Sequence, residues 1–126
     1  MKDRRTPLAR VLGYGSAKDG SGHWWTQRVS AVALVFLGAW FLASLAQLPG
    51  LTYADVQEWL HRPVSAVLML LMIAGIARHS ELGIQVVIED YVHQPFLKVA
   101  SIVIVRFLHV LLAAISIFAV LRLAFR

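Results

Sequence analysis

The sequence predicts an all-α membrane protein with three transmembrane helices, and three observations lead to this fold class. Of the 126 residues, 59% are hydrophobic. The mean hydropathy of +0.69 is too high for a soluble domain of this size, which must cover its surface with polar groups. The apolar residues fall into three long runs separated by short polar segments. This length allows a single membrane domain spanning 1–126.

The composition also excludes several classes of function. No cysteine is present, which excludes disulfides, thiolate metal sites and thiol catalysis. The net charge is +5, but the basic residues crowd into one terminus beside long apolar runs. That pattern indicates membrane topology and lipid contact, so we expect no nucleic-acid partner.

Residues 1–28 are expected to form a polar, glycine-punctuated cytoplasmic arm that ends at the membrane surface. No hydrophobic run follows the first charges directly, as it would in a secretory signal. His23, Trp24 and Trp25 lie where aromatic side chains often mark the membrane interface.

The first transmembrane helix is predicted at 29–48, because about 20 apolar residues at 1.5 Å per residue cross a hydrocarbon core of about 30 Å. Pro49 and Gly50 end it. The polar connection 51–62 follows, and Thr52 suits the N-cap of a short interfacial helix there.

The second helix is predicted at 63–88, with Pro63 in its first turn, where a missing N–H is tolerated. The uninterrupted apolar run 64–77 is too short to span a bilayer, so the helix must continue through Arg78, His79 and Glu81. These ionisable side chains are therefore expected inside the membrane, where such groups usually face a partner, a cofactor or water. A third helix is predicted at 97–121, with Pro95 opening it.

Orientation is predicted from the basic residues outside the spans. The arm to Arg28 and the second loop contain seven Lys or Arg residues, against three in the first loop and the C-terminal end. We therefore expect the N-terminus and the loop after Asp90 and Tyr91 to lie in the cytoplasm.

His79 is the strongest candidate for a functional side chain. Gly75, Gly83, Val86 and Asp90 share its face of the helix at about 100° per residue. Glycines one turn above and below an imidazole leave a slot where a flat macrocycle can lie, and neutral imidazole is an axial ligand of haem iron. The alternative is that both glycines simply allow two helices to approach closely.

Asp90 and Tyr91 are candidates for a quinone site at the membrane surface. A phenol beside a carboxylate can donate a hydrogen bond to a quinone carbonyl and relay protons. The alternative is an interfacial tyrosine anchor next to an exposed acid.

Five other polar residues have open roles. His109 lies at a depth comparable to that of His79, so an intrachain bis-histidine site is geometrically possible, although a hydrogen bond across a helix interface is commoner. Arg106 can snorkel, or pair with Glu81 or a haem propionate. Arg28 can reach a propionate or a lipid phosphate. Arg78 and Glu81 are expected to form a mutual or partner-directed charge pair.

The chain resembles the hydrophobic membrane anchor subunits of succinate dehydrogenase over nearly its whole length. The resemblance is carried by 22–29 (GHWWTQRV) before the first span and by His79-x3-Gly83-x6-Asp90-Tyr91, and the run 85–93 (QVVIEDYVH) is similar to the alphaproteobacterial and mitochondrial version. It implies one half of a heterodimeric membrane anchor bundle in a bacterial inner membrane. It also implies a subunit of succinate:ubiquinone oxidoreductase with no activity expected from the isolated chain.

The resemblance also implies partners and sites. The partners would be a cytochrome b556 subunit, an iron–sulfur subunit and a flavoprotein subunit. His79 matches the family's axial ligand of haem b, with the second histidine supplied by the cytochrome b subunit. Tyr91 matches the quinone-contacting tyrosine, Asp90 its neighbouring acid, and Arg28 the arginine where the chain enters the membrane. His109 matches no family ligand.

Two alternatives stay open at this point. A stand-alone transporter or channel subunit would use Arg78, Glu81 and Arg106 as an intramembrane relay and bind no chromophore. A purely structural anchor would keep the fold and partners without haem.

Overall fold

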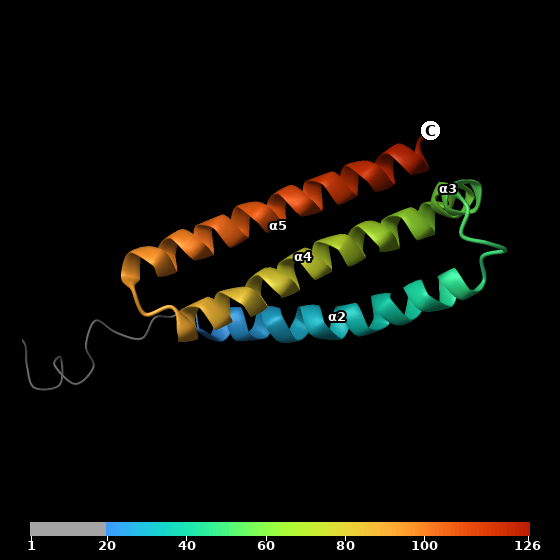
Figure 1. Ribbon diagram of the computed structural model, residues 1–126. Coiled ribbons are helices and arrows are strands. Elements are labelled where there is room, and N and C mark those ends of the chain that lie inside the picture. Colours follow the sequence, from blue (N-terminus) through green and yellow to red (C-terminus); the bar gives the residue numbers. More distant parts are fainter. Residues whose placement is uncertain (1–19) are drawn as a thin grey trace, which may run out of the picture.

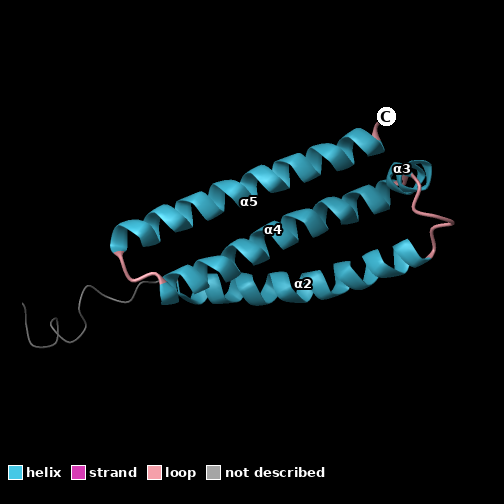
Figure 2. Ribbon diagram, in the orientation of Figure 1, coloured by secondary structure: helices cyan, strands magenta, loops and turns pink. Residues whose placement is uncertain are grey.

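The computed structural model describes residues 20–126, which are almost entirely helical. The helices are α2 (Gly20–Ala46), α3 (Tyr53–His61), α4 (Pro63–Tyr91) and α5 (Pro95–Ala124). No strand occurs in this part of the chain (Figure 2). Helices α2, α4 and α5 are each long and apolar enough to cross a membrane, so the predicted fold class is confirmed.

Helix α4 lies between α2 and α5 and packs against both (Figure 1). The backbones of α2 and α5 do not contact each other anywhere in residues 20–126. One end of the bundle holds the start of α2, the end of α4 and the start of α5, and we call it the loop end after the 92–94 connection. The opposite end holds α3 and the C-terminus, and we call it the α3 end.

The N-terminal boundary of the first span differs from the prediction. Helix α2 begins at Gly20, so 20–28 of the expected arm are helical, and 1–19 lie outside the described residues. A helix satisfies its own backbone polar groups, which favours its continuation through the water-poor interface where Trp24 and Trp25 lie. The other spans also run slightly beyond their predicted ends, α4 to Tyr91 and α5 to Ala124.

The helix starts predicted from Thr52, Pro63 and Pro95 agree with the structure. Pro63 and Pro95 each occupy a first-turn position. Thr52 caps α3 in a capping box: Asp55 N–H donates to Thr52 Oγ1 over 3.3 Å, and Thr52 N–H donates to Asp55 Oδ2 over 3.1 Å. The short interfacial helix expected from Thr52 is therefore confirmed.

The best-packed apolar cluster lies at the α3 end. Trp59 and Leu60 of α3 are buried with Val120 of α5. Trp59 also stacks on Trp40 of α2, with ring centroids 5.7 Å apart and planes at 23°. Helix α3 thus ties the ends of the long helices together, while the polar residues of interest lie toward the loop end.

Candidate functional site

The imidazole of His79 projects from α4 toward α2 and is half-buried. Its Nδ1 lies 3.0 Å from Ser30 Oγ, and its Nε2 lies 3.4 Å from Gln27 Nε2. Gln27 and Ser30 are one turn apart on α2, so a single polar face of that helix meets both ring nitrogens.

One tautomer of His79 satisfies both contacts of Ser30. Ser30 Oγ lies 3.1 Å from the carbonyl oxygen of Gln27, to which it can donate, and 3.0 Å from His79 Nδ1. When the hydroxyl hydrogen points to Gln27, Ser30 accepts from the Nδ1–H of the imidazole. Nε2 then keeps its lone pair, which faces the Gln27 amide at a distance longer than most N–H hydrogen bonds.

These residues fit an axial haem ligand. A ligating histidine usually donates its other ring N–H to a neighbouring acceptor, which fixes the ring and the tautomer. Ser30 provides this acceptor, and Nε2 is the nitrogen left for a metal. Gln27 Oε1 is buried and has no hydrogen-bond partner among the described residues. The one hydrogen-bonding group that faces His79 Nε2 in residues 20–126 is therefore an amide whose own hydrogen bonds are incomplete.

Gly75 and Gly83 both face α2, but their surroundings differ. A Cβ at Gly75 would lie 3.1 Å from Leu34 Cδ2, so this glycine allows close approach of α4 and α2. A Cβ at Gly83 would meet only the end of the Gln27 side chain, at 3.7 Å. Close helix packing, the alternative considered from the sequence, is thus what Gly75 provides, and the space beside Gly83 depends on the position of Gln27.

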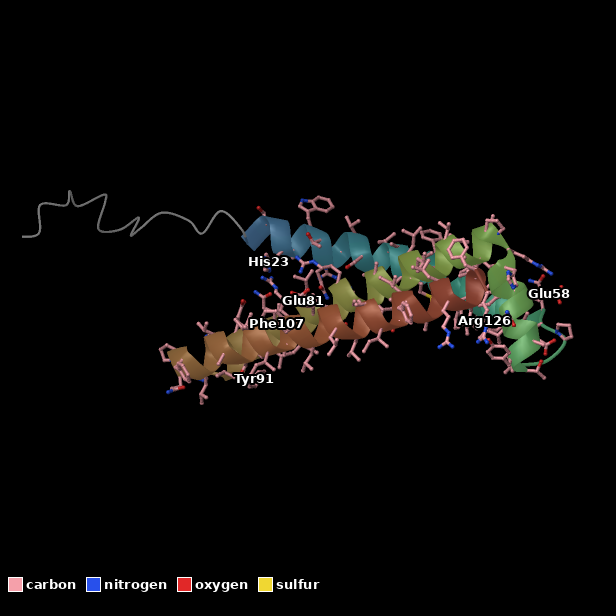
Figure 3. All side chains as sticks on the ribbon, turned by 90° about the horizontal axis from the view of Figure 1, so that it is seen from above. His23, Glu58, Glu81, Tyr91, Phe107 and Arg126 are labelled. Atoms are coloured by element: carbon pink, nitrogen blue, oxygen red, sulfur yellow. The ribbon has the colours of Figure 1, made fainter. Side chains whose placement is uncertain are left out.

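Asp90 and Tyr91 end α4 at the loop end (Figure 3). Both are exposed, Tyr91 by 78%, and its hydroxyl has no hydrogen-bond partner within residues 20–126. The connection beside them is fixed by His93 Nδ1, 3.0 Å from the Tyr91 carbonyl, and by Lys98 Nζ, which donates to the Glu89 carbonyl over 2.8 Å. The phenol is therefore held at the surface with its polar atom available.

Arg28 lies on the exposed face of α2, and its guanidinium carbon is 5.6 Å from the centroid of the Trp24 ring. This distance is within the range of a cation–π contact. No ion pair of Arg28 occurs in the described part of the chain.

Glu81, buried between α4 and α5, binds two arginines. It accepts from Arg78 Nη1 over 3.0 Å and from Arg106 Nε of α5 over 2.8 Å. We call Arg78, Glu81 and Arg106 the Glu81 triad. The expected Arg78–Glu81 pair is confirmed, and of the roles considered for Arg106 the structure has the pairing with Glu81.

His109 is not brought together with His79. Its Nδ1 lies 2.8 Å from the carbonyl oxygen of Val105, one turn earlier on α5, whereas His79 faces α2 on the other side of α4. Residues 20–126 contain no group of three or more His, Asp or Glu side chains that could hold a metal ion by themselves. An intrachain bis-histidine site is therefore absent from this arrangement.

The sequence reasoning missed Ser30 and Gln27. Both interrupt an apolar helix at i and i+3, a spacing that places two polar groups on one face. That signal points to a polar contact within the membrane, but it does not identify His79 as the contact.

Comparison with known proteins identifies relatives over most of the chain. Residues 2–121 match the succinate dehydrogenase/fumarate reductase transmembrane subunit family. A succinate dehydrogenase hydrophobic membrane anchor subunit from Rickettsia bellii is 34% identical over 119 residues, covering 94% of each chain. That from Paracoccus denitrificans is 32% identical over 118 residues, covering 94% of this chain and 91% of its own. A succinate dehydrogenase membrane anchor subunit from Reclinomonas americana is 30% identical over 100 residues, covering 77% and 83%.

Proposed function

We propose that this chain anchors the flavoprotein and iron–sulfur subunits of a succinate:ubiquinone oxidoreductase to the membrane. The reason is that the chain belongs to the succinate dehydrogenase/fumarate reductase transmembrane subunit family. In this role it shares haem b with the cytochrome b subunit and contributes to the ubiquinone site. The chain is a multi-pass bacterial inner-membrane anchor subunit of the succinate dehydrogenase type, which associates with the other subunits of that complex.

The observation that best supports haem binding is the contact between Ser30 Oγ and His79 Nδ1, 3.0 Å apart. Ser30 holds the ring and its proton on the α2 side, which leaves the Nε2 lone pair for iron once the Gln27 amide moves aside. When bound, haem b supplies a one-electron redox centre. Since His79 offers one nitrogen, a second axial ligand would come from the cytochrome b subunit.

The quinone site is proposed at the loop end. Tyr91 would donate its phenolic hydrogen to one quinone carbonyl, and Asp90 beside it would exchange protons with the cytoplasm. The exposure of both side chains and the unpaired Tyr91 hydroxyl support this role. The charge distribution of the sequence predicts that the loop end is cytoplasmic, where the soluble subunits would cover it.

Arg28 is proposed to contact a haem propionate. It lies one position after Gln27 on α2, and its guanidinium is exposed over Trp24. An exposed guanidinium near the membrane surface can pair with a carboxylate of the cofactor or with a lipid phosphate, because both are anions.

Replacing His79 by alanine tests the proposal. The intact complex, purified in mild detergent and reduced with dithionite, should show a b-type absorbance spectrum that His79→Ala abolishes. His109→Ala is the matched control and should keep the spectrum, because His109 bonds only to its own helix. An unchanged spectrum in His79→Ala would refute the ligand assignment. No spectrum in the wild-type complex would favour a haem-free anchor or a transporter.

A further inference from the structure

The Glu81 triad has more positive charge and more donors than its own residues use. It holds two guanidinium groups and one carboxylate, a formal charge of +1. The Glu81 side chain is 11% exposed, whereas those of Arg78 and Arg106 are 43% and 57% exposed. Each guanidinium carries five N–H donors, and only one of each bonds to Glu81. No other acceptor for either arginine is found among residues 20–126.

The triad lies within the membrane-spanning part of the bundle, nearer to the loop end. Along their helices, Glu81 is about 15 Å from Tyr91 and Arg106 about 16 Å from Pro95, at 1.5 Å per residue. Helices α4 and α5 have 29 and 30 residues, about 45 Å each, so a hydrocarbon core of about 30 Å centred on them includes the triad. In Figure 3, Glu81 lies between Tyr91 at one end of the bundle and Glu58 at the other. Because Glu81 holds both guanidinium groups at this depth, they are drawn away from the lipid phosphates.

An uncompensated positive charge at this depth favours an anion beside it, because ionised groups in the membrane usually pair with one another. Helices α2, α4 and α5 of a second copy would not supply it at this level. Helices α2 and α5 contain no Asp or Glu, and the only acid in the middle of α4 is Glu81 itself, which is already occupied. A different membrane protein that reaches the same depth is therefore the source we consider.

We propose that the exposed guanidinium groups of Arg78 and Arg106 form a docking site for a transmembrane helix of another subunit that carries an Asp or Glu at matching depth. The partner carboxylate completes a four-membered network with no net charge, in which Glu81 holds the two arginines side by side. This site contacts α5, whereas His79 contacts α2 across α4, so the docking site is separate from the proposed haem site. It requires only that a second membrane subunit is present.

The central test compares Arg106→Gln with Arg106→Lys in the complete complex. Arg106→Gln leaves a neutral Arg78–Glu81 pair and removes the ion pair between α5 and α4. A purely internal role would therefore lower the amount of this chain itself, but not the amount of partner per copy of it. Docking predicts instead that the amount of second membrane subunit recovered per copy of this chain falls about 10-fold or more, because a buried acid on the partner loses its counterion. Arg106→Lys keeps the charge and should restore most of the recovery. Arg122→Gln, near the α3 end of the same helix, is the matched control.

The measurement also separates the other sources of an anion. Normal subunit recovery with lost haem in Arg106→Gln would overturn docking in favour of a haem propionate. Normal recovery with less co-purified anionic phospholipid would overturn it in favour of a lipid. If haem is lost from His79→Ala while subunit recovery still depends on Arg106, the haem site and the docking site are shown to be independent.

A second measurement does not depend on the stability of Arg106→Gln. The amine introduced by Arg106→Lys can be coupled to a neighbouring carboxylate with a membrane-permeant carbodiimide, and the product identified by mass spectrometry. We expect a cross-link to an Asp or Glu within a transmembrane helix of the partner. If Glu81 is the only carboxylate coupled, the docking proposal is wrong.

Discussion

Ser30 contacts Nδ1 of His79 and offers the ring nitrogen an acceptor. When the Ser30 hydroxyl donates to the Gln27 carbonyl, it accepts from Nδ1–H, and Nε2 is the nitrogen without a proton. The proposed metal-binding role of His79 therefore draws on a residue of another helix.

Ser30→Ala should weaken haem retention without removing it. The variant keeps the His79 ligand but loses the acceptor for Nδ1–H, and loss of such an outer partner typically lowers metal affinity 10- to 100-fold, so we expect about a 10-fold loss. Haem content after dilution into detergent and the haem midpoint potential would measure the effect. Ser44→Ala, on the same helix, is the control. Equal behaviour of the two variants would contradict the positioning role of Ser30.

Tyr91→Phe should separate the two half-reactions of the complex. Removing the phenolic hydroxyl takes away a hydrogen-bond donor to the quinone, so ubiquinone reduction should fall about 10-fold or more. Succinate oxidation with an artificial acceptor should be unchanged, because that reaction does not need the quinone site. Tyr53→Phe, at the exposed start of α3, is the control. An equal loss of both activities in Tyr91→Phe would argue against a quinone contact.

At the scale of the helices, the interface between α2 and α4 depends on Gly75. Leu34 of α2 packs directly on the bare backbone of this glycine, at a distance that leaves no room for a larger side chain. In membranes, close backbone approach replaces the hydrophobic effect as a source of helix association.

Gly75→Leu should destabilise the bundle by about 1–3 kcal/mol through overpacking. The thermal inactivation temperature of the purified complex should fall, and the second change Leu34→Ala should restore part of it by opening space opposite. Gly38→Leu is the matched control, because a Cβ at Gly38 meets nothing within 4 Å in this chain. If Leu34→Ala rescues Gly38→Leu as well as Gly75→Leu, the proposed contact is not the cause.

The helices themselves could be predicted well because lipid restricts a spanning segment to a few solutions. Apolar length predicted the spans, Pro63 and Pro95 predicted two starts, and Thr52 predicted α3. The start of α2 at Gly20 could not be predicted, because glycine-rich, polar residues disfavour a helix in water and only the interfacial surroundings reverse that preference.

The polar contacts were predictable only where they are local in sequence. Arg78 and Glu81 are one turn apart, so their pairing follows from helix geometry alone. Which partner Arg106 and His79 select depends on how α5 and α2 are rotated against α4, and the sequence pattern does not specify this rotation. The Ser30–His79 contact therefore appeared only in the structure.

At the scale of the whole molecule, three long helices with α4 in the middle form a bundle with little interior. Within residues 20–126 no side chain is completely buried, and the large apolar side chains of α2 and α5 are mostly exposed. Lipid acyl chains can cover such surfaces, but they cannot neutralise the Glu81 triad or satisfy the buried Gln27 amide. The polar groups, more than the apolar ones, thus require the rest of the complex.

The isolated chain should consequently be much less stable than the chain in its complex. A partner that binds only the folded form adds about 3 kcal/mol at 100 times its dissociation constant, which raises the melting temperature of a domain this small by about 10 °C or more. Circular dichroism melts of the chain produced alone and together with the second membrane subunit, in the same detergent, would measure this difference. Adding only the two soluble subunits is the control, because in the proposed complex they would cover the loop end and leave the Glu81 triad bare. If the lone chain melts at the same temperature as the membrane heterodimer, its buried polar groups are satisfied without a partner in the membrane.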